Sequence, residues 1–88
     1  MSLERVLKTL ESFGLSRVES EVYVYLAKAG PSKAMDLTIS LRMPKQKLYP
    51  ILKKLKEKEI VITKPERNNL YSALAFTELL NRYVKINA

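Results

Sequence analysis

Apolar residues in the first two thirds of the chain recur mainly at three- and four-residue steps, the period of one face of an α-helix. This spacing predicts four helices, over residues 2–13, 16–29, 32–41 and 44–59. The pattern then changes, because residues 60–64 are mostly β-branched, 65–69 are polar turn formers and 70–74 are typical of a returning strand. Helical spacing returns over residues 76–86.

The second predicted helix has the clearest boundaries. Ser16 and Glu19 form an S-x-x-E capping box, in which each side chain accepts a hydrogen bond from a free backbone amide at the helix start. Gly30 and Pro31 favour termination at the other end. The spacing predicts a buried face made of Val18, Val22, Tyr25, Leu26 and Ala29.

The fourth predicted helix carries apolar and cationic residues on different faces. Its apolar residues fall within a sector of about 100° when successive residues are turned by 100°. They are Leu48, Ile51, Leu52 and Leu55. The remaining faces carry Lys45, Gln46, Lys47, Tyr49, Pro50, Lys53, Lys54, Lys56 and Glu57. Such a helix packs on its own domain and offers its outer face to a polyanion. An ordinary solvated lysine face is the alternative interpretation.

A short helix, a tight turn over residues 41–43 and the cationic helix are the components of a helix-turn-helix. A generic helical hairpin is the alternative from these residues alone. The β-hairpin that follows at once, with a basic residue near its tip, favours the first interpretation, because a hairpin after a helix-turn-helix is a wing. We therefore expect an α+β, mostly helical fold: a winged helix-turn-helix with one β-hairpin wing and additional N- and C-terminal helices.

The length of 88 residues favours one domain. Within it we expect an N-terminal helix over residues 1–14, a winged-helix core over 15–75 and a C-terminal helix over 76–88 that takes part in dimerisation.

The composition excludes several kinds of chemistry. Cysteine and histidine are absent, which removes disulfides, the usual zinc ligands, thiol nucleophiles and the commonest general base. Most of the nine carboxylates lie at helical spacing from Lys or Arg, as in surface ion pairs. We therefore expect no enzyme, no metal and no cofactor. The chain also lacks a membrane-length apolar run and a signal-peptide pattern, so we expect a cytoplasmic protein without a membrane partner.

The positive charge is concentrated in one part of the chain. The formal net charge is +7. Residues 1–41 hold five basic and five acidic residues, whereas residues 42–67 hold nine basic and three acidic ones, a balance of +6. The excess charge therefore falls on the fourth helix and the predicted wing, a distribution that favours a nucleic-acid partner.

Short segments spread over every predicted element match one family. They are Gly14-Leu15-Ser16, Glu19, Val22-Tyr23, Ala29-Gly30-Pro31, Met43-Pro44-Lys45, Lys47-Leu48-Tyr49, Ile51-Leu52, Leu55-Lys56-Glu57-Lys58, Leu70-Tyr71 and Glu78-Leu79-Leu80. Through them the stretch from Leu15 to Leu80 resembles the DNA-binding domain of TrmB-type archaeal transcription regulators, a branch of the winged helix-turn-helix proteins. The resemblance implies a nucleoid-associated DNA-binding regulator. Larger members of the family carry a sugar-sensing C-terminal domain, but no small-molecule effector site is recognisable in this sequence, so none is carried over from the resemblance.

Two residues depart from the family pattern. Arg42 stands where the turn usually has a glycine, so we expect a strained or differently shaped turn. Pro50 falls on the outward face of the recognition helix, where it removes a backbone hydrogen bond and should bend the helix.

The main functional hypothesis is sequence-specific binding of double-stranded DNA by a dimeric transcription regulator. The helix from Pro44 would enter the major groove, with Lys45, Gln46 and Tyr49 nearest the base edges. The wing would meet the adjacent groove or backbone. The predicted DNA-binding residues are Lys33, Arg42, Lys45, Gln46, Lys47, Tyr49, Lys53, Lys54, Lys64, Arg67, Asn68 and Asn69.

Two other functions fit the same sequence. The first is an architectural DNA-binding protein of low sequence preference, in which Gln46 and Tyr49 would not discriminate between bases. The second is a protein-interaction winged helix that docks on an acidic partner through its terminal helices. The concentration of charge on the fourth helix and the wing counts against the second.

The terminal helices carry more apolar residues than a small monomer comfortably exposes. We expect them to hold a homodimer, because two copies can contact two half-sites and gain specificity that one short site lacks. The predicted dimerisation residues are Leu3, Val6, Leu7, Leu10, Leu79, Leu80, Tyr83, Val84 and Ile86. The alternative is that these helices pack on each other within one chain and complete its core.

Overall fold

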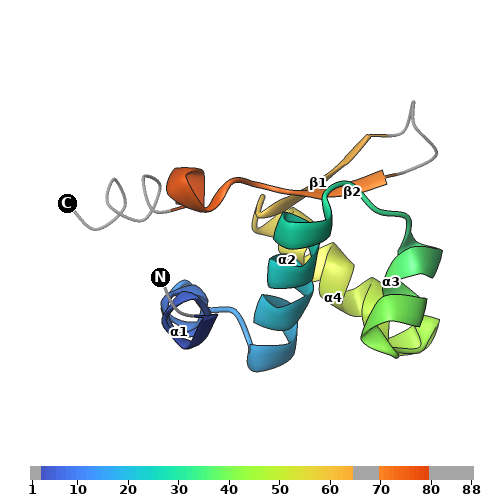
Figure 1. Cartoon of the computed structure of the whole chain (residues 1–88), viewed down its shortest axis with the longest axis horizontal. Helices are drawn as coiled ribbons and strands as arrows, with labels where there is room; N and C mark the ends of the chain where they lie inside the picture. The colour runs from blue at the N-terminus through green and yellow to red at the C-terminus, as the bar shows by residue number, and fades with distance from the viewer. Residues whose placement is uncertain (1–2, 65–69, 80–88) are drawn as a thin grey trace.

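The computed structural model of the chain describes residues 3–64 and 70–79. Its elements in chain order are α1 (Leu3–Ser12), α2 (Arg17–Ala29), α3 (Ala34–Leu41), α4 (Lys45–Glu57), β1 (Val61–Lys64) and β2 (Leu70–Ala73), and residues 76–79 are again helical. Figure 1 shows α1 and α3 toward opposite ends of the molecule, with α2 and α4 between them. Strand β2 contacts α2, and β1 contacts α4. This arrangement confirms the predicted winged helix-turn-helix.

The turn between α3 and α4 is closed by two backbone hydrogen bonds. The Arg42 N–H donates to the Ile39 carbonyl at 3.3 Å, and the Met43 N–H donates to the Thr38 carbonyl at 3.0 Å. Arg42 itself is left-handed, with φ 52° and ψ 46°, a conformation that costs a non-glycine residue about 1 kcal/mol or more. The strained turn expected from an arginine in place of glycine is thus confirmed. Pro44 was predicted to be the first residue of the fourth helix. It is instead the N-cap of α4, which begins one residue later, at Lys45.

The two strands form an antiparallel hairpin close to the predicted bounds. Val61 lies opposite Ala73, and Lys64 lies opposite Leu70. A single bridge adds Ser32 to the free edge of β2, because the Ser32 N–H donates to the Tyr71 carbonyl at 3.0 Å and the Tyr71 N–H donates back at 2.8 Å. The predicted wing contacts Arg67, Asn68 and Asn69 lie outside the described residues.

The core takes residues from the helices, the hairpin and the segments between them. Its buried members are Leu10, Leu15, Val22, Tyr23, Leu26, Leu37, Leu48, Leu52, Leu55, Ile60, Val61 and Leu79. The predicted buried face of α2 is wrong in part, because Tyr23 is 1% exposed while Tyr25 is half-buried and Ala29 is exposed. The Tyr23 hydroxyl donates to the Leu74 carbonyl. This hydrogen bond satisfies the polar end of the ring and allows it to enter the core.

The terminal apolar residues are largely covered by the chain itself. Leu7, Leu10 and Leu79 are buried, Val6 is half-buried, and Leu3 is 53% exposed. The three buried leucines are therefore not exposed to a second chain, contrary to the expectation. Leu7 and Leu10 lie on the apolar stripe of α1, which packs on α2, and Leu10 and Leu79 are members of the core. The other predicted dimerisation residues lie outside the described part of the chain: Leu80, Tyr83, Val84 and Ile86.

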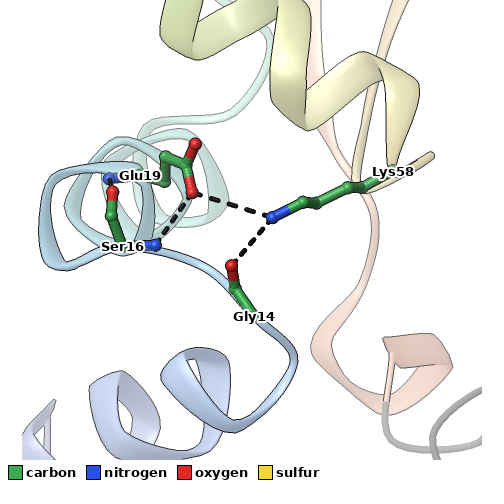
Figure 2. A network of polar contacts seen from close by, with 4 residues as sticks. All are labelled: Gly14, Ser16, Glu19 and Lys58. Carbon is green, nitrogen blue, oxygen red and sulfur yellow. Dashed lines mark hydrogen bonds and ion pairs between the residues drawn. The ribbon is translucent and has the colours of Figure 1, made fainter.

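A polar network ties the C-terminal end of α4 to the start of α2. Glu19 N–H donates to Ser16 Oγ at 3.1 Å, and Ser16 N–H donates to Glu19 Oε1 at 2.8 Å, which confirms the predicted capping box. Lys58, the C-cap of α4, donates to the Gly14 carbonyl at 2.9 Å, and its Nζ lies 3.8 Å from Glu19 Oε1. Figure 2 shows Lys58 reaching across to the segment that joins α1 and α2. The network thereby helps to set the orientation of α4.

We expect Ser16→Ala to lower the free energy of unfolding by about 1 kcal/mol, because a backbone amide at the start of α2 loses its acceptor. Ser12→Ala is the matched control, since the Ser12 hydroxyl bonds only within the exposed surface of α1, and its effect should stay within about 0.5 kcal/mol. Urea unfolding followed by circular dichroism measures both. Equal effects of the two substitutions would contradict the capping role.

Burial raises the pKa of Tyr23 to about 12. Since the fold favours the neutral phenol, this contribution to stability is fully present below about pH 10 and declines as the pH rises toward 12. Near pH 8, Tyr23→Phe should lower the free energy of unfolding by about 1 kcal/mol through loss of the bond to Leu74. Near pH 11.5 the difference should shrink or reverse, because phenylalanine has no proton to lose. Urea unfolding at both pH values tests this, and a constant difference would show that Tyr23 is not the titrating group.

Candidate nucleic-acid interface

Helix α4 presents its polar residues to solvent because its apolar residues enter the core. Leu48, Leu52 and Leu55 are buried and Ile51 is half-buried. The predicted DNA-contacting residues of this helix are all exposed: Lys45, Gln46, Lys47, Tyr49, Lys53 and Lys54. No acidic residue occurs in α4 before Glu57. The exposed surface of most of the helix is therefore cationic, with one amide and one aromatic ring near its N-terminal end.

One flank of α4 faces the hairpin across a groove of about 570 Å³. The groove is lined by Tyr49, Leu52, Lys53, Lys56, Glu57 and Tyr71. Tyr49 is 47% exposed and Tyr71 is half-buried. Burial and the nearby Tyr49 raise the pKa of Tyr71, so the Tyr71 phenol stays neutral and able to donate a hydrogen bond at physiological pH. Two phenols and two lysines thus meet between α4 and β2.

The opposite flank of α4 has a different character. There Lys54 and Lys58 border a hollow of about 660 Å³ beside the segment that joins α1 and α2. The same hollow is lined by three carboxylates, which belong to Glu11, Glu19 and Glu57. Carboxylates repel a phosphate at close range, so Lys54 stays a predicted phosphate contact but has less favourable surroundings than Lys53, whose groove holds a single carboxylate.

The other predicted cationic contacts that the structure describes are exposed and lie outside α4. Lys33 is the N-cap of α3 and follows Ser32, the residue that bridges to β2. Arg42 lies in the turn before α4, and Lys64 is the last residue of β1. The cationic residues therefore extend from α4 to the helix before it and to the hairpin.

Pro50 lies inside α4 and is exposed. Proline has no N–H, so the Gln46 carbonyl lacks the helical hydrogen bond that residue 50 would otherwise donate. The bend that this should cause remains a prediction.

Two features of this surface were not predicted from the sequence. The sequence predicts that Tyr71 belongs to a strand, but its position beside Tyr49 depends on the strand register and on the packing of the hairpin against α4. The sequence places Lys56 on a flank of the helix but predicts no function for it. The alternation of side chains along the returning strand was the available signal for Tyr71. It assigns Tyr71 to one face of the hairpin, but it does not say which face lies against α4.

Within residues 3–64 and 70–79, histidine, cysteine and carboxylate side chains nowhere gather in a group of three or more that could hold a metal ion. In the same part of the chain, every helix is too short or too polar to cross a membrane.

Comparison with known proteins identifies the family. The family described as "Sugar-specific transcriptional regulator TrmB" matches residues 10–77. The chain is similar to two proteins of Pyrococcus furiosus (strain ATCC 43587 / DSM 3638 / JCM 8422 / Vc1). It is 41% identical over 58 residues to the "HTH-type sugar sensing transcriptional regulator TrmBL1". This alignment covers 66% of this chain and 17% of that protein. It is 27% identical over 86 residues to the "Putative HTH-type transcriptional regulator TrmBL2". This second alignment covers 97% of this chain and 33% of that protein.

The chain thus spans between about a sixth and a third of the length of these two relatives. No solved structure matches it with statistical significance. The family match covers more than three quarters of the chain, including α2, α3, α4 and both strands. The resemblance noted in the sequence is confirmed, and the chain belongs to the TrmB family of transcriptional regulators.

Proposed function

We propose that the chain binds double-stranded DNA with sequence specificity, as a dimeric transcription regulator. Helix α4 enters the major groove, and the β1–β2 hairpin lies on the adjacent groove or backbone. The observation that carries the proposal is the exposed cationic surface of α4, whose opposite face is buried in the core. Membership of the TrmB family supports the same function.

Lys45 and Gln46 are the proposed base-reading residues. They occupy the first turn of α4 and are exposed, and the first turn of a recognition helix is the part that contacts base edges. Glutamine pairs well with adenine, and lysine pairs well with guanine, in the major groove. Around them we assign the phosphate contacts to Lys33, Arg42, Lys47, Lys53, Lys54 and Lys64, and we keep the contacts predicted from the sequence for Arg67, Asn68 and Asn69.

The dimer is proposed on functional grounds. One winged helix contacts a short site, which gives little discrimination against the excess of non-specific genomic DNA. Two copies related by a two-fold axis contact two half-sites about one helical turn apart. Of the predicted apolar contacts that the structure describes, Leu3 is the most exposed, so it is the best available probe of a contact through α1.

We expect Lys45→Ala to weaken DNA binding, and the affinity of the wild-type chain to fall steeply with salt. If about three of the candidate cations in each chain neutralise a phosphate, counterion release from about six phosphates per dimer gives a log–log slope near −5. Fluorescence anisotropy with a labelled duplex over a salt series measures both quantities. Lys8→Ala is the matched control, because it removes one exposed lysine from α1 and should leave the affinity almost unchanged. Wild-type binding that is absent at low salt, or indifferent to salt, would refute the proposal.

Gln46→Ala distinguishes base reading from architectural binding. If Gln46 contacts a base, the substitution should cost about 1–3 kcal/mol on a preferred site and leave non-specific binding unchanged. The preferred site is found by selecting duplexes from a random pool with the wild-type chain. An equal loss on selected and random duplexes would favour the architectural alternative.

We expect sedimentation equilibrium at micromolar concentration to give the mass of two chains. Leu3→Asp should lower the fraction of dimer, because the substitution places a charge on the exposed part of the α1 stripe. Leu7 is unsuitable for this test, since it is buried in the chain itself. A mass of one chain at every concentration would rule out the dimer.

A further inference from the structure

Tyr71 is held in place more firmly than a residue at a sheet edge usually is. Its strand partner is Thr63 on β1, and on the other side both its N–H and its carbonyl bond to Ser32, at 2.8 and 3.0 Å. The ring packs against the core while contributing to the wall of the groove beside α4. The Tyr71 phenol is therefore a fixed donor at this position, and fixed donors bind an anion without a large cost in side-chain order.

Across the groove, one flank of α4 supplies the complementary groups. With successive residues turned by 100°, Lys45, Tyr49, Lys53 and Lys56 fall within a sector of about 80°. Tyr49, Lys53 and Lys56 line the groove itself, together with the single carboxylate of Glu57. The balance of these ionisable groups is two ammonium groups against one carboxylate, with two neutral phenols beside them. This combination suits one monoanionic group that accepts several hydrogen bonds.

The groove also has the location that a DNA strand requires. It lies between α4, the proposed major-groove helix, and β2, a strand of the proposed wing. If the helix and the wing contact neighbouring grooves, the sugar–phosphate backbone that separates the two grooves passes between them.

We propose that this groove seats one phosphate of the DNA backbone between the phenols of Tyr49 and Tyr71, with Lys53 and Lys56 at its side. The inference rests on the proposed DNA binding and extends it to a residue of β2, Tyr71. It also assigns the Tyr49 hydroxyl to a phosphate in place of a base edge. The phosphate fixes the position of α4 relative to the duplex, so the base contacts of its first turn depend on it.

Tyrosine-to-phenylalanine substitutions test the phenols, because each removes one hydroxyl and keeps the ring. Tyr49→Phe and Tyr71→Phe should each weaken binding to the selected duplex about tenfold, the lower end of what a hydrogen bond to a charged group contributes. Tyr25→Phe is the control, since the Tyr25 hydroxyl bonds Ser40 Oγ at 2.9 Å and the side chain lines a different hollow, between α1 and α2. It should bind DNA as the wild type does. Thermal unfolding should confirm that Tyr71→Phe is folded at the assay temperature.

Salt dependence separates the two kinds of contact. A phenol is neutral, so Tyr71→Phe should shift the log–log salt plot without changing its slope. Lys53→Ala should reduce the slope by about one for each chain bound, because one fewer counterion is released. An unchanged slope for Lys53→Ala, or binding of Tyr71→Phe at the wild-type affinity, would overturn the proposal.

A duplex with a single methylphosphonate linkage then locates the phosphate. At one position in each half-site, this neutral linkage should lower the DNA affinity of the wild-type chain about tenfold. It should lower the affinity of Tyr71→Phe much less, because the variant has already lost that contact. If every position affects the two proteins equally, Tyr71 does not bind a backbone phosphate and the inference is wrong. If the wild-type chain binds no duplex at all, it is the proposed function that fails, a result that differs from either outcome for Tyr71.

Discussion

Burial of the apolar face of α4 determines which side of the helix reaches solvent. Leu48, Leu52 and Leu55 are all buried, and each such side chain contributes roughly 1.5–3 kcal/mol when it is removed from water. Residues of one helix keep fixed angular positions, so burial of this face forces Lys45, Gln46 and the other polar residues outward. The same hydrophobic packing that stabilises the domain therefore creates its cationic surface.

Three further contacts determine how that surface is presented. Lys58 binds the Gly14 carbonyl and lies close to Glu19, which holds the end of α4 against the start of α2. Tyr23 connects α2 to the residue after β2 through the Leu74 carbonyl. The Ser32 bridge fixes the edge of β2 on the other side. Together these contacts join α4, α2 and the hairpin, so the groove between helix and wing has defined walls.

Much of the fold was predictable because its determinants are local. The capping box at Ser16, the helix periods and the change to β-branched residues after Glu59 all act within a few residues of the positions they specify. The strained turn at Arg42 was predictable from the family resemblance, because the family usually has a glycine at this position, and Arg42 is indeed left-handed.

The errors arose where the outcome depends on distant residues. The spacing of α2 favoured Tyr25 over Tyr23 for the core, but it could not reveal the acceptor of the Tyr23 hydroxyl, the Leu74 carbonyl, which lies some fifty positions away. Leu7 and Leu10 showed the spacing of an intermolecular seam, yet they are covered within one chain. Tyr71 was missed for the same reason, because the phenol of Tyr49 beside it in the groove comes from a separate element.

The outer face of α4 and the flank facing the hairpin together form the proposed DNA-binding surface. Amide chemical-shift mapping of the ¹⁵N-labelled chain during titration with the selected duplex tests it most directly. We expect the largest chemical-shift changes at the first two turns of α4 and at Tyr71. The amides of α1 should not shift where they face away from a dimer partner. Changes centred on the hollow beside Gly14 and Glu19, or spread evenly over the chain, would contradict the account.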